Sequence, residues 1–372
     1  MTLARKKLAA LLAPADVALD GARPWDLRIH DERMPRRVLL GGSLGVGESY
    51  MDGWWDCEAL DEMLTRALRL HVDENVSHGA NLLAPILDLL RNPQSRTRAF
   101  IVGRQHYDIG DDLYQRMLDR RMIYSCGYWA RAASLDEAQE HKLDLVCRKL
   151  GLQPGMRVLD IGCGWGGAAR YAAERYAVSV TGVTVSKNQA RAAQETCAGL
   201  PVKILLQDYR SLDEREPFDR IYSLGMFEHV GARNYGIYFR KVRKLLKPDG
   251  LFLLHTIGAN RATHGTDPWI ERYIFPNSHL PSTAEIAGAA EPLWVIEDWH
   301  SFGSDYDLTL MSWSRNIRAR WDEIASHYND RFRRMWNYWL MASAASFRAR
   351  RNQLWQVVFS PMGTLGGFRE VR

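Results

Sequence analysis

The sequence predicts an α/β fold in which helices cover both faces of a mostly parallel sheet, together with a smaller, mainly helical N-terminal domain. Two observations support this prediction. From about residue 136 onward, short apolar strand-like segments alternate with helical segments, and parallel strands need such crossover connections. The first of these strands ends in a glycine-rich turn, "GCGWGG" at 162–167, that leads into a helix. In sheets of this kind, ligands bind at the carboxyl ends of the strands.

The expected domain boundaries follow changes in the sequence pattern. Residues 1–92 are expected to form the helical N-terminal domain, with one strand-like piece, "DLRIH", at 26–30. The glycine-rich stretch 41–56 lacks the lysine of a phosphate-binding loop, so we expect a turn that leads into a packing helix. A polar stretch with one proline, "RNPQSRTR", marks the linker, which we place at 93–105. Residues 106–372 then form the α/β domain that carries the chemistry.

The individual elements are read from periodicity and from the turn residues between them. Strands are expected at 157–161, 178–186, 203–208, 218–225, 250–258 and 354–360. Helices are expected at 136–150, 166–175, 187–198 and 235–246, and again beyond 310. The N-terminal stretch is basic and then apolar, but Pro14 and Asp16 break it, so it predicts an amphipathic helix rather than a signal peptide.

Composition is that of a globular chain, with 46% hydrophobic and 25% charged residues among 372. The formal net charge of +5 is too small to indicate nucleic-acid binding, although it is compatible with an acidic surface as partner. The five cysteines form no CxxC pair, so we expect neither a disulfide framework nor a metal site. No run of eighteen apolar residues occurs, and we therefore expect a cytoplasmic protein without a membrane-spanning helix.

The strongest chemical signal is "VLDIGCGWGG" at 158–167. Its glycines, Gly162, Gly164 and Gly166, allow the backbone to turn sharply and to approach a ligand closely. The spacing is G-x-G-x-G with Asp160 ahead of it, which differs from the G-x-G-x-x-G of dinucleotide-binding folds. This pattern resembles the first motif of class I S-adenosylmethionine-dependent methyltransferases. A tight strand–helix turn without a ligand is the alternative interpretation.

Further polar residues follow the next two strands. Many methyltransferases place an acidic residue for the ribose at the end of the second strand, whereas this chain has Thr184 there. Asp208 follows the third strand, at a place suited to the adenine amino group. Single residues of this kind are also common as strand-end caps. The resemblance adds, as candidate cofactor contacts, Tyr124, Ser125, Gln189 and Gln207.

Two titratable side chains fall at the carboxyl ends of adjacent predicted strands. Glu228 lies in "SLGMFEHVG", next to His229, and His255 lies in "LLHTIG". A lone histidine is more often structural than catalytic. Two such residues at neighbouring strand ends nevertheless indicate the place where a substrate meets the methyl donor.

Together the motifs resemble the bacterial cyclopropane-fatty-acyl-phospholipid synthases, a family related to the mycolic acid cyclopropane synthases. The similarity covers nearly the whole chain and includes "YSCGYW", "VLDIGCGWGG", "MFEHVG", "LLHTIG", "DPWIERYIFP" and "SDYDLTLM". Gly127 stands where the family usually has alanine, and the last dozen residues match poorly. The resemblance implies a Rossmann-like fold with a seven-stranded sheet and S-adenosylmethionine as the methyl donor.

The resemblance also implies the reaction. A carbon from S-adenosylmethionine is added to the cis double bond of an unsaturated phospholipid acyl chain, and loss of a proton from the new methyl group closes a cyclopropane ring. The implied base is a bound bicarbonate ion, whose implied holders are Cys126, Glu228, His255, the backbone of Ile257, and Tyr306. A nucleophilic thiol and a plain core cysteine are the rival interpretations of Cys126.

Partners are implied as well. The N-terminal domain resembles the lipid-engaging and dimer-forming region of the family, so we expect a homodimer that binds the inner face of the cell membrane peripherally. The basic N-terminal helix, and the arginines interleaved with tryptophans beyond residue 310, favour docking on unsaturated phospholipids at an anionic surface. A solvated helical face is the alternative interpretation of these arginines.

Two other functions stay open at this point. A methyltransferase of the same fold could add a methyl branch to a lipid or a small molecule, although such an enzyme would not need the Cys126, Glu228, His255 and Tyr306 set. A non-enzymatic lipid-binding or cofactor-sensing protein would bind S-adenosylmethionine without turnover.

Overall fold

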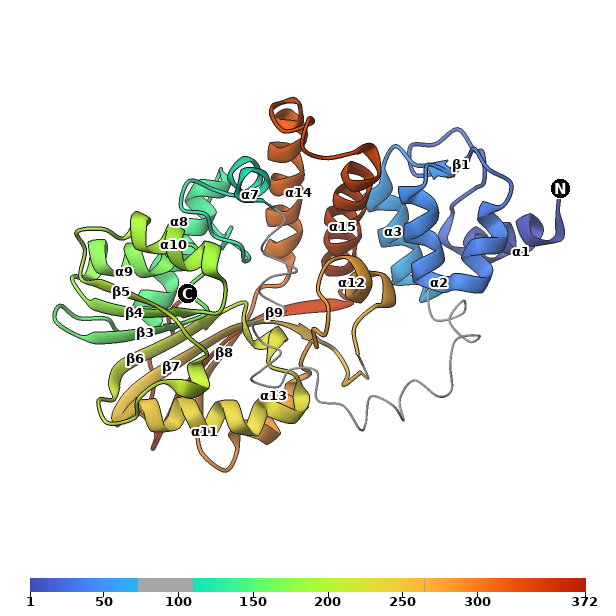
Figure 1. Ribbon diagram of the computed structural model, residues 1–372. Helices are drawn as coiled ribbons and strands as arrows, with labels where there is room; N and C mark the ends of the chain where they lie inside the picture. The colour runs from blue at the N-terminus through green and yellow to red at the C-terminus, as the bar shows by residue number, and fades with distance from the viewer. Residues whose placement is uncertain (73–109, 264) are drawn as a thin grey trace. The chain divides into compact units, whose positions relative to one another are not determined.

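The computed structural model describes residues 1–72, 110–263 and 265–372 (Figure 1). The linker expected at 93–105 and the boundary expected at residue 92 lie outside the described residues. The chain divides into two compact units, each made of three segments. The helical unit contains Met1–Arg91, Thr266–Pro276 and Tyr306–Asn352, and the sheet unit contains Asn92–Gly265, Asn277–Asp305 and Gln353–Arg372.

Helices and one short two-stranded sheet make up the helical unit. Its elements are α1 (Leu3–Leu12), β1 (Arg28–Ile29), α2 (Met34–Met51), β2 (Trp55–Asp56), α3 (Leu60–Arg69), α12 (Pro268–Tyr273), most of α14 (Ser304–Ala319) and α15 (Asp330–Arg348). The amphipathic N-terminal helix is confirmed as α1, while the strand expected at 26–30 is only the two residues of β1. The turn expected from residue 41 to lead into a packing helix is confirmed: the backbone breaks at Gly42, with a φ of 54°, and the helical segment that follows runs to Met51.

The helical unit differs from the expected N-terminal domain because it includes the long helix α15. This helix packs against α2 and α3. Its buried face carries Met335, Trp336, Trp339 and Leu340. Three ion pairs join it to the N-terminal segment: Arg331–Asp52 at 2.9 Å, Arg334–Asp56 at 2.7 Å and Arg348–Asp61 at 2.7 Å. An amphipathic helix buries its apolar stripe against any complementary face, and sequence periodicity alone does not say which face that is.

The segment Thr266–Pro276 is held on α2 by an aromatic contact and by polar contacts to Glu48, one of which is the ion pair with Arg272 at 3.2 Å. Trp269 is fully buried, and it fills the space left by Gly47, where an added Cβ would lie 2.3 Å from the indole Cδ1. The Tyr273 hydroxyl donates a hydrogen bond to Glu48 Oε1 at 2.8 Å. Among the described residues, no helix combines the length and the apolar character that crossing a membrane requires.

The sheet unit contains a seven-stranded sheet in the order β5-β4-β3-β6-β7-β9-β8. Its strands are β3 (Arg157–Ile161), β4 (Ser179–Thr184), β5 (Val202–Leu206), β6 (Phe218–Leu224), β7 (Leu246–Ala259), β8 (Val295–Ser301) and β9 (Asn352–Ser360). The first five in the spatial order pair in parallel, and β8 pairs antiparallel with β9. The expected mostly parallel, seven-stranded sheet is confirmed.

Six strands lie where the sequence predicted them, and β8 is the one that the sequence analysis missed. Its sequence, "VIEDWHS", is short of apolar residues because β8 lies at the edge of the sheet. Val295 and Ile296 are themselves exposed, at 43% and 39%. An edge strand of this kind lacks the continuous apolar run by which buried parallel strands are recognised.

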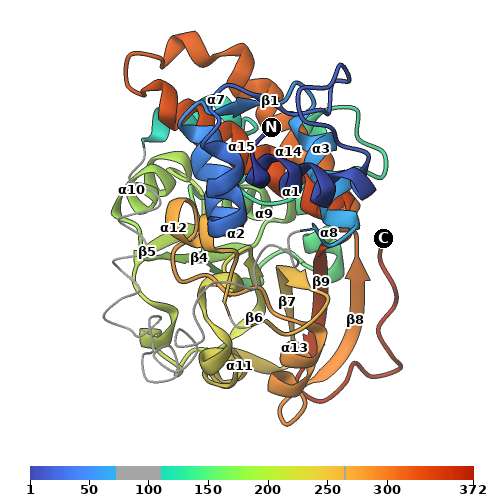
Figure 2. The same ribbon diagram turned by 90° about the vertical axis from the view of Figure 1, so that its right-hand side faces the viewer.

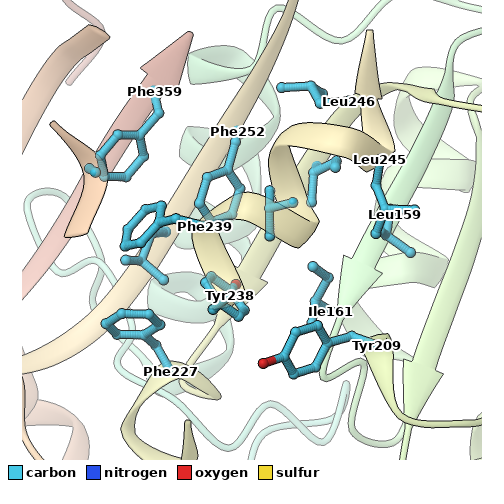
Figure 3. Close-up of a cluster of buried hydrophobic side chains, with 14 of the residues drawn as sticks. Leu159, Ile161, Tyr209, Phe227, Tyr238, Phe239, Leu245, Leu246, Phe252 and Phe359 are labelled. Atoms are coloured by element: carbon cyan, nitrogen blue, oxygen red, sulfur yellow. The ribbon is translucent and has the colours of Figure 1, made fainter. Parts of the chain in front are cut away.

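Helices cover both faces of this sheet (Figures 1 and 2). On one face lie α8 (Leu135–Lys149), α9 (Gly167–Tyr176) and α10 (Lys187–Thr196), and on the other lie α11 (Tyr235–Leu245) and α13 (Thr283–Ala290). The core beneath α11 is rich in aromatic rings (Figure 3), and the rings of Phe252 and Phe359 stack with centroids 5.6 Å apart. This packing leaves the carboxyl ends of β3 to β7 at one edge of the sheet.

We expect Gly47→Ala to lower the free energy of unfolding by about 1–3 kcal/mol, because the added methyl group would overlap the buried Trp269 ring. The matched control is Gly41→Ala in the same helix, where an added Cβ meets no atom within 4 Å. That control should be neutral or stabilising by about 0.5–1 kcal/mol, since alanine favours helix over glycine. Urea unfolding of both variants is the measurement, and equal stabilities would contradict the packing described.

Candidate active site

The glycine-rich loop connects β3 to α9 at the carboxyl edge of the sheet. Gly162, Gly164 and Gly166 have φ values of 91°, 52° and 85°, a region that other residues rarely adopt. The N–H groups of Gly162 and Cys163 both donate to the Val183 carbonyl oxygen, at 2.9 and 3.0 Å. These two bonds fix the start of the loop against β4, so the turn lies as the sequence predicted.

The three glycines differ in what surrounds them. A Cβ added to Gly162 would lie 2.8 Å from Met226 Cβ, and one added to Gly166 would lie 3.0 Å from Ala193 Cβ. Both positions therefore need glycine for packing within the protein. At Gly164, no atom lies within 4 Å of an added Cβ. Gly164 is thus the position at which the loop leaves room for a ligand.

Asp160, one residue before the end of β3, carries a buried carboxyl group beside this loop. It is 1% exposed, and its Oδ2 has no hydrogen-bond partner among the residues that the structure describes. Burial raises the pKa of Asp160 to about 7, while Tyr222 and the charge of Lys142 act to lower it. S-adenosylmethionine carries an ammonium and a sulfonium group, so a buried carboxyl group at this edge of the sheet suits this donor.

Three of the expected cofactor residues lie together at the ends of β4 and β5. Thr184 Oγ1 donates to Gln189 Oε1 at 2.9 Å, which joins the end of β4 to the first turn of α10. The backbone N–H of Gln207 donates to the Thr184 carbonyl oxygen at 2.9 Å. The sequence placed these residues on separate elements, and parallel pairing of β4 with β5 brings them to one edge.

Asp208 is also buried at this edge, but a neighbour already occupies its carboxylate. Arg210 contacts both oxygens, with Nε 2.8 Å from Oδ1 and a terminal nitrogen 2.6 Å from Oδ2. The backbone N–H of Arg210 also donates to Oδ1, at 2.8 Å. An adenine amino group at Asp208 would share the carboxylate with Arg210, a pairing that the sequence analysis did not anticipate.

Helix α8 holds the segment that contains Tyr124 and Ser125. Gln139 Nε2 donates to the Ser125 carbonyl oxygen at 2.8 Å, and Lys142 Nζ donates to Ser125 Oγ at 2.9 Å. Both α8 side chains are fully buried. The Tyr124 ring packs edge-on against Tyr114, with centroids 5.2 Å apart.

Gln139 and Lys142 are residues that the sequence analysis missed. A signal for them exists in the pattern of the helix predicted at 136–150. They lie three residues apart and share the face that buries Leu135, Ala138 and Val146. Two long polar side chains on an otherwise apolar helical face indicate a polar partner inside the protein.

Pairing of β6 with β7 brings Glu228, His255 and Ile257 together. Leu224, the last residue of β6, pairs with His255. Glu228 follows in the short turn Phe227–His229, and its Oε1 accepts a hydrogen bond from the Ile257 N–H at 2.7 Å. The proximity of Glu228 and His255 that the sequence predicted is therefore present.

Burial shifts the protonation of both side chains. It raises the pKa of Glu228 to about 7, against the opposing effect of the Ile257 hydrogen bond. It lowers the pKa of His255 well below its usual value, and the positive charges of Lys142 and Lys149 act in the same direction. Glu228 Oε2 and His255 Nε2 are buried without a hydrogen-bond partner in the part of the chain that the structure describes. Near neutral pH the site therefore offers a carboxyl group close to its pKa and a neutral imidazole.

The other two expected site residues lie in different units. Cys126 is fully buried in the sheet unit, and its neighbour Ser125 borders the end of β6, where a Cβ added to Gly225 would lie 3.7 Å from Ser125 Cβ. Tyr306 belongs to the helical unit, where its ring packs against Phe347 with centroids 4.6 Å apart. The joint action of Tyr306 with Glu228 and His255 stays a prediction.

Sequence comparisons place this chain beside lipid-modifying methyltransferases. The family model for mycolic acid cyclopropane synthetase matches residues 94–357. Cyclopropane-fatty-acyl-phospholipid synthase of Escherichia coli (strain K12) is 54% identical over 363 residues, which are 97% of this chain and 94% of that protein. Tuberculostearic acid methyltransferase UfaA1 of Mycobacterium tuberculosis is 35% identical over 351 residues, 88% of this chain and 81% of that protein.

Solved structures agree with the fold. The mycolic acid cyclopropane synthase CmaA1, complexed with SAH and CTAB, matches with a TM-score of 0.65 and 35% identity, over 70% of this chain and 97% of that one. Coclaurine N-methyltransferase, bound to N-methylheliamine and SAH, matches with a TM-score of 0.69 at 21% identity, over 85% of this chain and 98% of that one. The expected class I methyltransferase fold is confirmed.

We expect Gly164→Ala to weaken binding of S-adenosylhomocysteine at least tenfold, because its methyl group would project into the open space at the loop. The matched control is Gly155→Ala. Gly155 also has positive φ, 84°, and open surroundings, but it precedes β3. Both variants carry a similar backbone strain, so a difference in affinity reports on the ligand rather than on the fold. Titration calorimetry is the measurement, and equal affinities in the two variants would exclude Gly164 from the cofactor site.

Proposed function

The chain belongs to the mycolic acid cyclopropane synthetase family, and we propose that it converts the cis double bond of an unsaturated phospholipid acyl chain into a cyclopropane ring, with S-adenosylmethionine as the one-carbon donor. The identity of 54% over nearly the whole chain supports both the donor and the lipid class. An isolated double bond is a weak nucleophile, so close and aligned positioning of the two substrates carries much of the catalysis. The open position at Gly164 and the carboxyl group of Asp160 support placement of the donor at the end of β3.

The proposal rests on two buried polar atoms at the carboxyl edge of the sheet, Glu228 Oε2 and His255 Nε2, which have no hydrogen-bond partner among the described residues. Methyl addition leaves positive charge on the acyl chain, and ring closure then requires a base for one proton of the new methyl group. We propose that Glu228 and His255 hold a bicarbonate ion, which would supply that base. Two buried polar atoms that lack partners suit a small hydrogen-bonding anion better than they suit the acyl chain itself.

Protonation decides how Glu228 and an anion can share the site. Two negative groups in contact repel, but the pKa of Glu228 is raised to about 7 by burial, so its carboxyl group can carry a proton and donate it in a hydrogen bond. His255 is neutral and can offer a ring N–H without adding charge. The Ile257 N–H already donates to Glu228 Oε1, so its proposed role is to orient this carboxyl group. Cys126 and Tyr306 are the remaining proposed walls of the site.

A second function would add a methyl branch without closing the ring. It has support from the relative named as tuberculostearic acid methyltransferase, at 35% identity. The cyclopropane synthase of Escherichia coli is more similar, at 54% over a larger share of the chain. We therefore favour ring formation. Mass analysis of the lipid product before and after mild hydrogenation separates the two, because the ring and a methyl-branched alkene have the same mass but only the alkene takes up two hydrogens.

We also propose that the enzyme reaches its lipid at an anionic membrane surface, through the helical unit. Most arginines beyond residue 310 are engaged inside this unit. Those in ion pairs with acidic side chains are Arg320, Arg331, Arg333, Arg334 and Arg348. Arg315 and Arg318, near the end of α14, are exposed and have no ion-pair partner among the described residues. Together with the exposed Lys6 and Lys7 of α1, these two carry the proposed attraction to anionic lipid. The expected homodimer stays a prediction.

Most of the tryptophans expected to support docking are buried. Trp313, Trp336 and Trp339 are buried in helices and Trp355 in strand β9, while Trp321 is partly exposed. The spacing of the three helical tryptophans is also that of the apolar stripe of a packed helix, and their burial shows that they serve this packing. The docking proposal therefore rests mainly on charge.

We expect Glu228→Gln to lower the rate of cyclopropane formation at least tenfold, which corresponds to about 1.4 kcal/mol in the barrier. Glutamine keeps the shape and the acceptor for the Ile257 N–H but cannot lose or share a proton. The affinity for S-adenosylhomocysteine should stay within about twofold of the wild-type value, because Glu228 lies beyond the glycine loop. Cys126→Ser, which keeps a small polar group, should have the milder effect on rate.

The rate assay is run in degassed buffer, with and without added bicarbonate. The wild-type rate should rise when bicarbonate is restored, and the rate of Glu228→Gln should respond less. A wild-type rate that ignores bicarbonate, together with normal turnover in Glu228→Gln, would sink the proposed base.

For the membrane proposal, we expect binding to anionic vesicles to weaken as salt rises, because screening shortens to about 8 Å at physiological ionic strength. The double variant Arg315→Gln/Arg318→Gln should bind more weakly than the wild type. Its control is Arg170→Gln/Arg191→Gln, which removes the same charge from α9 and α10 of the sheet unit. Co-sedimentation is the measurement, and equal binding by the two double variants would contradict docking through α14.

A further inference from the structure

Lys142 is a buried cation that the proposed mechanism does not use. Its side chain lies on α8 and is 0% exposed. Removal of an ammonium group from water is costly unless the group is paired. No carboxylate lies within ion-pair distance of Lys142 in the described chain. The Lys142 ammonium group instead donates a hydrogen bond to Ser125 Oγ, at 2.9 Å.

Comparison with Lys149 shows that this arrangement is unusual even within the same helix. Lys149 lies two turns further along α8 and is also buried, at 1% exposure. Its Nζ forms an ion pair with Asp298 at 2.9 Å and contacts His300 Nδ1 at 3.2 Å. A direct salt bridge therefore compensates for the burial of the Lys149 ammonium group. The ammonium of Lys142 instead contacts a hydroxyl group in the segment next to the glycine loop.

Ser125 is held from two sides by α8. Its carbonyl oxygen accepts from Gln139 while its hydroxyl accepts from Lys142. Because Gln139 and Lys142 lie three residues apart, they project from one face of the helix. The same segment is fixed at its start by Asp119, which accepts from the N–H groups of Arg121 and Ile123 at 2.9 and 2.8 Å. The backbone before Cys126 is thus held at Arg121, Ile123 and Ser125.

The clamped residue borders the catalytic edge of the sheet. A Cβ added to Gly225 would touch Ser125 Cβ at 3.7 Å, and the Gly225 N–H donates to the His255 carbonyl oxygen at 2.9 Å. Ser125, which Lys142 contacts, therefore lies beside Gly225, the residue whose backbone is bonded to His255. Burial lowers the pKa of Lys142, and Asp119, Cys126 and Asp160 act in the opposite direction.

We propose that Lys142 is a positioning residue for the donor: its ammonium group fixes Ser125 against the carboxyl edge of the sheet, where S-adenosylmethionine binds. The inference rests on the proposed function for the identity of the ligand. It does not depend on the lipid, on bicarbonate or on ring closure. The chemistry of the cluster supports it, since a hydroxyl group that accepts from a lysine has its own proton free to donate to a ligand.

The test is a double-mutant cycle on affinity for S-adenosylhomocysteine, measured by calorimetry with the full-length chain. Lys142→Met keeps the length of the side chain and removes the ammonium group, and Ser125→Ala removes its partner. Each single variant should bind about tenfold more weakly than the wild type. The double variant should be no worse than either single variant, because both changes break the same contact. Lys149→Met, the matched loss of a buried cation from α8, should bind within about twofold of the wild type.

Thermal unfolding of each variant separates loss of fold from loss of positioning. If Lys142→Met does not fold, Lys142→Gln replaces it, since glutamine can still donate to Ser125 and should retain more affinity than Ser125→Ala. Wild-type affinity in the Lys142 variant, additive losses in the double variant, or an equal loss in Lys149→Met would each overturn the inference. Failure of the proposed function looks different: the wild-type protein would form no cyclopropane product, while the affinity cycle would still give its result.

Discussion

The hydrogen bond from the Ile257 N–H to Glu228 Oε1, at 2.7 Å, is the contact on which the arrangement of the site depends. Glu228 is not on a strand, and its side chain would have no fixed position without an anchor on β7. The bond provides that anchor two residues beyond His255, so parallel pairing of β6 with β7 sets the geometry of both side chains. A buried carboxyl group that is satisfied on one oxygen only is costly, and such groups persist where they have a use.

The same burial governs the electrostatics of the whole edge. Desolvation raises the pKa values of Asp160 and Glu228 to about 7, and it lowers the pKa of Lys142 to about 8. The pKa of each of these three groups therefore lies near neutral pH. Charged ligands would interact strongly with these groups, since little water is present to screen them.

The helical unit follows a different principle. Several of its arginines form ion pairs with Asp52, Asp56 and Asp61. Most of the tryptophans of its long helices are buried in packing contacts. Composition alone suggested a basic aromatic surface, whereas the fold pairs much of that charge with acidic side chains of the same unit. Of the arginines near the end of α14, Arg315 and Arg318 are the pair that the structure keeps available for an external partner.

The sequence by itself determined the fold class, six of the seven strands and the location of the glycine loop, because these depend on local periodicity and on residues with special backbone freedom. It also placed Glu228 and His255 at neighbouring strand ends, since strands that are consecutive in the chain are usually neighbours in the sheet. Tertiary structure alone decided what depends on distant partners. It brought Lys142 and Gln139 to Ser125, paired Asp208 with Arg210, and grouped α15 with the N-terminal helices. The edge strand β8 was also decided by tertiary structure, because it is defined by its pairing with β9 and not by an apolar run of its own.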